Sequence, residues 1–478
     1  MAKDEGKLAN LLALLPEQDW ERLRLFLNSP YFNRSAAVRA LLEVHWETWA
    51  NQADFPEDEK LFAGIFPNAA FDAVKLKNLR AALQRKLDDF FAQSAFEQDE
   101  LLQHQMQLRK LSALAAHHYF PRYHQKALTV AESSFQDEQQ RQLALMHFAE
   151  LQEGASPQSQ SRGQSPQASL SYHHAWQFFQ LKTLMYLVWQ YNAGAIMGQG
   201  ADTHHAEAIL PLIAVGQGAL PAVRLYRQLL QVFQEPDESA HFQQLRQLLQ
   251  AEAAGLAASD ALSLYTGAIN HCIRRVNRGE VAFLDTMLTL YKEMDQRGLL
   301  LVNGKLSAAQ LKNMVMLAIR CQQLDWAEDW VGRYGKLLEN DPHGTAEAFN
   351  QGMLQYARGD FEGAERWFHK VLIQFQDVFY GLDARSVLLQ IYYETGNVVG
   401  MESLSESFKM FVKRNKRIAK AHKEGYLATA RFFRKLIQIH PWEVDALKKL
   451  QAEIVATAFA SSSKRWLLDK VGQLLARE

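Results

Sequence analysis

The sequence predicts an all-α protein in which an N-terminal helical unit is followed by an α-solenoid of antiparallel helix pairs. The 478 residues include only 12 prolines and no extended alternation of β-branched residues, which favours helix over sheet. Apolar residues recur at helical spacing between short breaks along most of the chain. Residues 345–400 carry two similar helix–turn–helix units, and such units must stack because none can bury its apolar face alone.

Residues 1–95 are expected to form the N-terminal helical unit. Two apolar runs at helical spacing come first. Pro30 ends the second run, because proline disfavours helical dihedral angles in the residue before it. Asn33 or Ser35 can then cap the next helix, and a further helix is predicted over 72–95.

One polar stretch divides the rest of the chain. Residues 96–152 predict a helical segment of two or three helices. Of the 17 residues in 153–169, 13 are Ser, Gln, Gly or Pro, which is typical of a flexible loop. Because helical patterning resumes at once, this loop is either a domain linker or an insertion within one array. Residues 170–478 are expected to form the α-solenoid, with its clearest repeats at about 307–414.

Short breaks separate the helices expected in the solenoid. Turns of two to six residues are typical of antiparallel neighbours. The expected helices cover about 171–192, 204–214, 219–234, 237–254, 259–277, 280–296, 307–322, 325–339, 345–357, 361–375, 383–394, 398–414, 418–439, 442–459 and 463–476.

Charge and cysteine content argue against several classes of protein. The 52 basic and 53 acidic residues give a net charge of −1, so no global field would hold the chain on nucleic acid or on an anionic membrane. Cys272 and Cys321 cannot build a disulfide framework, and we expect buried free thiols in a reducing compartment. The N-terminus does not read as a signal peptide and no 18 apolar residues run together, which predicts a cytoplasmic location without a membrane span.

The first repeat unit has a regular internal geometry. Counted from Thr345, Gly352 is at the eighth position, Gly359 at the fifteenth, Ala364 at the twentieth and Phe368 at the twenty-fourth. Small residues allow two helices to cross closely, and the aromatic ring fills the groove between pairs. The second unit departs from this pattern, since a methionine, residue 401, takes the place of the alanine.

The turns between paired helices recur at a nearly constant interval. Leu324, Gly359 and Gly396 are 35 and 37 residues apart. This is close to the period of about 34 residues that is typical of two-helix repeats.

With this spacing the chain resembles the tetratricopeptide repeat family over about 100 residues. The resemblance implies a non-catalytic scaffold that binds a protein or peptide partner on the concave face, which the first helix of each pair lines. Carried over by position, the binding residues would be Asn350, Met353, Tyr356, Ser386, Gln390 and Tyr393. The alternative is an unused surface, or contact with another part of the same chain.

A broader resemblance rests on three segments. Residues 26–33, 269–280 and 465–469 resemble those of a group of large helical proteins from Bacteroidetes-type bacteria. This resemblance implies a fold and no activity.

A basic run is the strongest local charge. Between residues 409 and 423 there are seven Lys or Arg and no acidic residue. If helical, Lys409, Lys413, Lys416 and Lys420 would form one stripe that could bind nucleic acid or an acidic partner. The alternative is a solvated helix C-terminus, where cations interact favourably with the helix dipole.

Motifs for catalysis are absent from the sequence. The histidine pairs at 117–118, 173–174 and 204–205 are adjacent, whereas a metal site on a helix needs i, i+4 spacing. The glycine pairs near 198–200 and 216–218 lack the lysine and the spacing of a phosphate loop. We therefore predict no enzyme, no metal and no cofactor, with an enzyme that uses an unrecognised inter-helix site as a further alternative.

Overall fold

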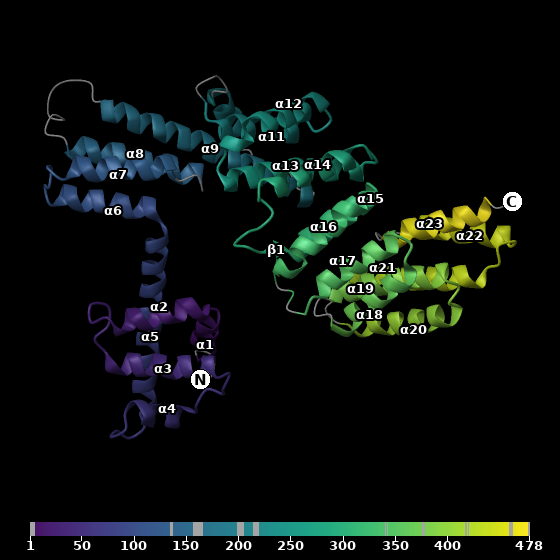
Figure 1. The fold of residues 1–478 in the computed structure, drawn as a ribbon, viewed down its shortest axis with the longest axis horizontal. Coiled ribbons are helices and arrows are strands. Elements are labelled where there is room, and N and C mark those ends of the chain that lie inside the picture. Colours follow the sequence, from purple (N-terminus) through teal and green to yellow (C-terminus); the bar gives the residue numbers. More distant parts are fainter. Residues whose placement is uncertain are drawn as a thin grey trace. The chain divides into compact units, whose positions relative to one another are not determined.

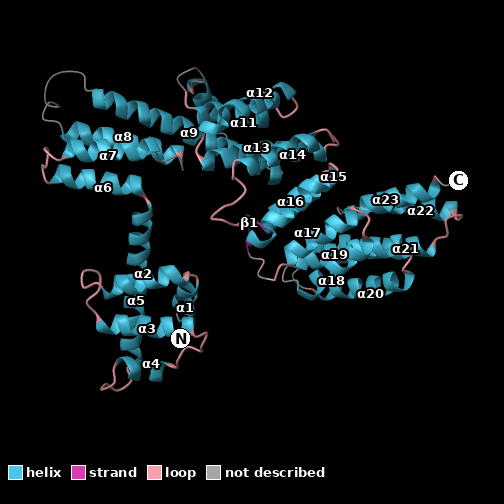
Figure 2. Cartoon of the chain, in the orientation of Figure 1, coloured by secondary structure: helices cyan, strands magenta, loops and turns pink. Residues whose placement is uncertain are grey.

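The computed structural model describes residues 5–133, 137–155, 166–197, 205–213, 219–339, 341, 343–374, 378–415, 418, 420–457 and 462–476. Their regular structure is almost entirely α-helical, as the sequence predicts (Figures 1 and 2). The helices divide into two compact units, Met1–Lys182 and Thr183–Glu478. Within the described ranges no helix combines the length and the apolar character needed to cross a membrane.

In the described part of the first unit, all regular secondary structure is helical. Its helices are α1 (Glu5–Ala13), α2 (Glu17–Asn28), α3 (Ala36–Ala50), α4 (Asp58–Ile65), α5 (Ala73–Gln98), α6 (Glu100–Ala113), α7 (Phe120–Ser133), α8 (Glu138–Ala155) and the first half of α9 (Pro166–Met197).

Two hydrophobic clusters fill this unit. The first joins α1 to α5, and in it the Trp20 ring lies 5.7 Å from the rings of both Trp46 and Trp49. The second joins α6 to α8 around the fully buried Phe148. As predicted, Ser35 caps a helix: its hydroxyl accepts a hydrogen bond from the backbone N–H of residue 38 at 3.3 Å, at the start of α3.

The predicted loop over 153–169 is helical at both ends. Residues 153–155 close α8 and residues 166–169 open α9, while residues 156–165 lie outside the described part of the chain. Along the chain, the boundary between the two compact units falls within α9, after Lys182.

The second unit adds a pair of two-residue strands to its helices. Its elements are the second half of α9, α10 (Ala206–Ile209), η2 (Leu210–Leu212), α11 (Pro221–Gln234), α12 (Ser239–Glu252), η3 (Ala253–Gly255), α13 (Ala258–Asn277), α14 (Phe283–Gln296), β1 (Leu306–Ser307), α15 (Ala308–Arg320), α16 (Leu324–Tyr334), η4 (Gly335–Leu337), β2 (Leu338–Glu339), α17 (Thr345–Ala357), α18 (Phe361–Gln374), α19 (Val378–Glu394), α20 (Val398–Arg414), α21 (Lys420–Gln438), α22 (Val444–Ala456) and α23 (Ser462–Leu475).

Helices of the second unit pack both on the next helix and on the next but one. From α11 to α19, each odd-numbered helix packs on the even-numbered helix that follows it, so that α11 pairs with α12 and α19 with α20. Helix α20 also packs on α21. In addition α15 packs on α17, α17 on α19, α19 on α21, and α21 on α23. Stacked helix pairs require this double set of neighbours. The parallel pairing of β1 with β2, with Leu306 opposite Leu338, was not expected from the sequence.

The pair α17–α18 shows why small residues recur in the repeat. A Cβ atom on Gly352 would lie 3.0 Å from the ring of Phe368, which is fully buried. Gly359 has φ +79°, a conformation that favours glycine, in the turn between the helices. In the second repeat the larger Met401 is also fully buried. Its packing therefore accommodates the departure from a small residue.

Two helical glycines test this close crossing. We expect Gly352→Val to lower the free energy of unfolding by about 2 kcal/mol, because the added methyl groups overpack the Phe368 ring. Gly332→Val is the matched control, since no atom lies within 4 Å of a Cβ at this exposed helical position. Urea denaturation of both variants measures the difference. Equal effects at the two positions would contradict the packing assignment.

Two of the titratable side chains that helix α13 buries are those of His271 and Cys272. Burial raises the pKa of the Cys272 thiol to about 12, and the other cysteine, Cys321, is partly exposed; neither forms a disulfide. His271 is 2% exposed and stacks on Phe242, with ring centroids 4.7 Å apart. Among the described residues neither of its ring nitrogens has a hydrogen-bond partner. Burial, reinforced by the positive charges of Arg274 and its neighbours, lowers the pKa of His271 to about 4.

This histidine should make the second unit sensitive to acid. The unfolded chain binds the proton near the ordinary pKa of 6.5, whereas the folded chain binds it only near 4. The free energy of unfolding should therefore be highest above pH 6.5 and fall, by up to about 3 kcal/mol, as the pH decreases to 4.

His271→Leu should flatten this pH dependence, as followed by urea denaturation from pH 4 to 7. It should not lower stability at pH 7, because an apolar side chain leaves no buried nitrogen without a partner. His343→Leu, at an exposed position, is the control. An unchanged pH profile in His271→Leu would refute the role of this residue.

Candidate functional site

The six residues predicted to bind a partner on the concave face, here called the groove residues, are largely buried. They are Asn350, Met353, Tyr356, Ser386, Gln390 and Tyr393. Asn350 is 0% exposed, and its amide donates a hydrogen bond to the Ala346 carbonyl at 2.9 Å. The Ser386 hydroxyl donates to the Leu382 carbonyl at 2.9 Å, and Met353 is buried. These three side chains are thus enclosed and, where polar, bonded within their own helices.

The other three groove residues lie against later helices of the same chain. Tyr356 Oη donates to Gln390 Oε1 at 2.9 Å, and the Gln390 amide in turn donates to Ser463 Oγ of α23 at 3.5 Å. The ring of Tyr393 packs on Trp466 of α23, with centroids 5.4 Å apart.

The prediction of a free binding surface at these positions is therefore wrong for Asn350, Met353, Ser386 and Gln390. The alternative, contact with another part of the chain, holds for Gln390 and for both tyrosines. Helices α21 and α23 both pack on α19, where three of the six residues lie. Contacts between helices so far apart in sequence cannot be read from the local pattern of one repeat.

The basic run does not form one continuous helical stripe. Helix α20 ends at Arg414, where Asn415 adopts extended dihedral angles, and α21 begins only at Lys420. The prediction of a single stripe is wrong because this break changes the direction of the chain. Lys416 lies outside the described residues, and only the backbone of Lys420 is described.

Two lysines of the run instead line a pocket between α20 and α21. Its volume is about 510 Å³, and the cap residue of α22, Thr457, completes its wall. Lys409 and Lys413 come from α20, and α21 adds Arg431 and Arg434. The remaining lining residues are Ser405, Glu406, Glu424, Leu427, Ala428 and Ala430.

The pocket has an excess of positive charge. Among the lining residues that the structure describes, four basic and two acidic side chains leave a net charge of +2. Glu406 is already paired, 2.7 Å from Arg434 and 3.7 Å from Lys409. Lys413 has no ion pair with any residue that the structure describes, so its charge remains available to a ligand.

Ser405 adds a buried hydrogen-bond donor to the lining. It is 3% exposed, and its hydroxyl finds no hydrogen-bond partner among the described residues. A buried polar group without a partner costs about 1–3 kcal/mol, so it needs an explanation. A ligand oxygen in the pocket would supply the missing partner.

Sequence reasoning found two of these residues and missed the others. Lys409 and Lys413 were visible as part of a charge run, but Arg431 and Arg434 follow it by about two helical turns or more. A signal did exist: the short connection after Arg414 predicts that two neighbouring helices fold back on each other. Pairing their facing positions would have brought the four cations together.

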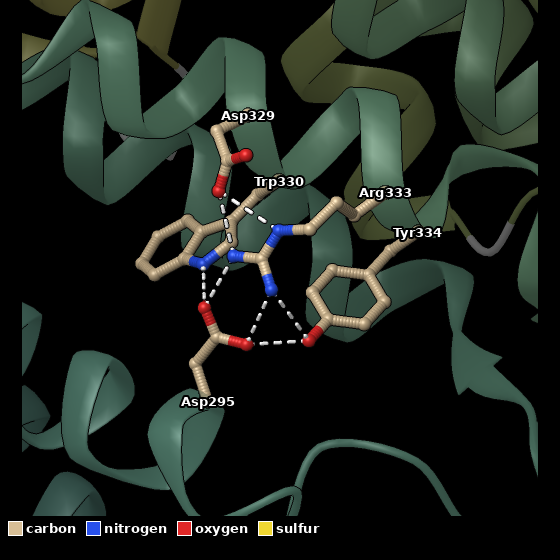
Figure 3. A network of polar contacts seen from close by, with 5 residues as sticks. All are labelled: Asp295, Asp329, Trp330, Arg333 and Tyr334. Carbon is tan, nitrogen blue, oxygen red and sulfur yellow. Dashed lines mark hydrogen bonds and ion pairs between the residues drawn. The ribbon is translucent and has the colours of Figure 1, made fainter.

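A second polar cluster is fully bonded within the protein (Figure 3). Asp295, at the end of α14, accepts hydrogen bonds from three side chains of α16: Trp330 Nε1 at 2.8 Å, Arg333 Nη1 at 2.9 Å and Tyr334 Oη at 2.5 Å. Asp329 also accepts from Arg333 Nε, at 2.8 Å. With its donors used internally, this cluster joins neighbouring helix pairs and offers little to a ligand.

The Asp295 cluster shifts the titration of its members. Burial alone raises the pKa of Asp295, but hydrogen bonds from Arg333, Tyr334 and Trp330 outweigh burial and hold it below its usual value. Burial and the hydrogen bond to Asp295 raise the pKa of Tyr334 to about 12. Both shifts favour the ionised carboxylate beside the protonated phenol.

The described histidines of the three pairs lie outside any group of residues that could hold a metal ion. His117 Nδ1 lies 3.0 Å from the Ala155 carbonyl, and His174 Nδ1 lies 2.8 Å from Gln142 Oε1. His204 lies outside the described residues. In the described ranges no three His, Cys, Asp or Glu side chains are grouped so as to hold a metal ion.

We expect Asp295→Asn to lower the free energy of unfolding by about 2 kcal/mol, because hydrogen bonds to a charged acceptor are lost. The loss should shrink at acidic pH. A depressed pKa means that Asp295 stabilises the fold above the ordinary value of 3.8, and less as the pH falls through its folded-state pKa.

Asp329→Asn is the matched control, because this exposed carboxylate pairs with the same arginine and should contribute less than about 1 kcal/mol. Chemical denaturation at pH 7 and pH 3 checks both variants. Equal losses at pH 7 would argue against Asp295 as the centre of the cluster.

Comparisons with known protein families, with curated proteins and with solved structures found no match to this chain.

Proposed function

We propose that this protein is a non-catalytic binding protein that holds an acidic segment of a partner protein in the α20–α21 pocket. The observation that supports this most is the convergence of Lys409, Lys413, Arg431 and Arg434 on one pocket of about 510 Å³. Ligand sites commonly have volumes of about 300–1,000 Å³ and place a few polar groups in an otherwise apolar lining. Here Leu427, with the neighbouring alanines, supplies the apolar part.

The two helices that form the pocket are well supported by the core. Phe408 and Val412 of α20 are fully buried, as are Phe432 and Phe433 of α21. Their packing holds the backbone of each helix in place, so the neighbouring charged side chains start from fixed backbone positions. A preorganised site of this kind loses less conformational entropy when it binds.

An acidic peptide fits the pocket better than nucleic acid does. A nucleic-acid strand needs a positive track along its backbone, and the break after Arg414 interrupts the expected stripe. Glu406 and Glu424 also interrupt the basic residues, so the pocket offers no continuous line of cations to successive phosphates. A peptide can place one acidic side chain beside Lys413 and leave the two glutamates in solvent.

A binding role also accounts for the pocket better than catalysis does. The described lining residues include no histidine or cysteine, and the only carboxylates among them that could take a proton from Ser405 belong to the two glutamates. Of these two, Glu406 is already engaged in ion pairs with Arg434 and Lys409.

Charge reversal of single residues tests the proposal. We expect Lys413→Glu and Arg431→Glu to abolish capture of a specific partner from native-host lysate. Arg414→Glu should leave that capture intact, because it changes the net charge equally but lies outside the pocket lining. Quantitative mass spectrometry measures the bound proteins, and the captured segment should be acidic.

Two results would contradict the proposal. One is capture that survives both pocket variants. The other is binding of duplex or single-stranded DNA that is lost with the same variants and falls steeply with salt, which would assign the pocket to nucleic acid.

A further inference from the structure

We infer that the acidic group held in the α20–α21 pocket is a phosphate monoester on a partner's side chain, rather than an aspartate or glutamate carboxylate. This inference rests on the proposed function and names the chemistry of its ligand. Net charge, an unused buried donor, and the placement of polar and apolar residues in the pocket support it.

The charge of the pocket matches a dianion. The lining carries a net charge of +2, as four cations outnumber two acids. A phosphorylated side chain carries a charge of about −1.5 to −2 at pH 7, whereas one carboxylate carries −1. A phosphodiester in a nucleic-acid backbone also carries −1, so the monoester complements the lining best.

The pocket offers an acidic group three donors of different kinds. Ser405 presents a hydroxyl that has no partner among the described residues, and Lys413 presents an ammonium group without an ion pair there. Arg431 adds a guanidinium, which suits phosphate because its N–H groups form a planar fork. The three terminal oxygens of a phosphate can accept from all three groups, while a carboxylate has only two oxygens.

The placement of these donors suits a group that enters on a side chain. Ser405, Lys409 and Lys413 follow one another at intervals of four residues on α20, so they share one helix face. On α21, Glu424, Leu427 and Arg431 share the facing side. Leucine and alanine within this lining can contact an apolar stem, and a volume of about 510 Å³ leaves room for residues that flank the phosphate.

The test uses three peptide mixtures that differ only at a central residue, which is phosphoserine, glutamate or serine. Flanking positions are degenerate, and binding to the full chain is measured by fluorescence anisotropy. We expect the phosphoserine mixture to bind at least tenfold more tightly than the glutamate mixture, and the serine mixture not to bind. Lys413→Glu and Arg431→Glu should abolish binding of both acidic mixtures.

Ser405→Ala separates the two ligand chemistries. It removes one donor without changing charge, so it should weaken the phosphoserine mixture about tenfold and leave the glutamate mixture nearly unchanged. Ser386→Ala is the matched control, because its hydroxyl is buried in α19 and lies outside the pocket lining. Circular dichroism confirms that each variant stays folded.

Each contrary outcome has a distinct meaning. Equal binding of the phosphoserine and glutamate mixtures, lost in Lys413→Glu, overturns the phosphate inference and leaves the proposed function standing. Inorganic phosphate that binds as tightly as the phosphoserine mixture overturns the side-chain source, because the free ion would then be the ligand. Failure of both acidic mixtures to bind overturns the inference, and continued partner capture in Lys413→Glu overturns the proposed function as well.

Discussion

The structure of the second unit depends on one constraint: each helix has an apolar face that only neighbouring helices can cover. Full burial of a large apolar side chain stabilises the fold by about 1.5–3 kcal/mol, and residues such as Phe368, Phe408 and Phe432 are completely buried in this way. Covering these faces requires contacts with the next helix and, for α15, α17, α19 and α21, also with the next helix but one. The same demand brings α21 and α23 onto α19 and encloses residues that a single repeat would leave open.

Polar groups in this fold follow two different rules. Where a carboxylate is buried at a junction, as Asp295 is, the chain supplies donors of its own, and the cluster joins two helix pairs. In the α20–α21 pocket the chain supplies cations and a hydroxyl but too few acceptors. Like charges resist being packed together without water or a counter-charge, so an opening remains where apolar faces would have closed it. A charge excess of this kind is more informative about function than the general architecture of stacked helices.

Much of the fold could be predicted because its signals are local. Gly352 and Phe368 stand at the spacing that close helix crossing requires, and Ser35 stands where a cap is needed. The candidate site was only half predictable. Lys409 and Lys413 belong to a visible run, whereas Ser405 and Arg431 are ordinary residues until two helices bring them together. The groove residues were misjudged for the opposite reason, since Gln390 and Tyr393 lie against a helix that begins some 70 residues later.

The sequence by itself determined the all-α class, most helix boundaries, the close pair at α17–α18 and the presence of a basic run. These depend on spacing within a few helical turns, where backbone geometry alone decides which side chains share a face. Only the tertiary structure decided which faces stay open, because that depends on helices distant in sequence. It ended the basic stripe at Arg414, buried Asn350 and placed Arg431 beside Lys413. The cation-lined pocket arises where two helices meet, and no single helix encodes it.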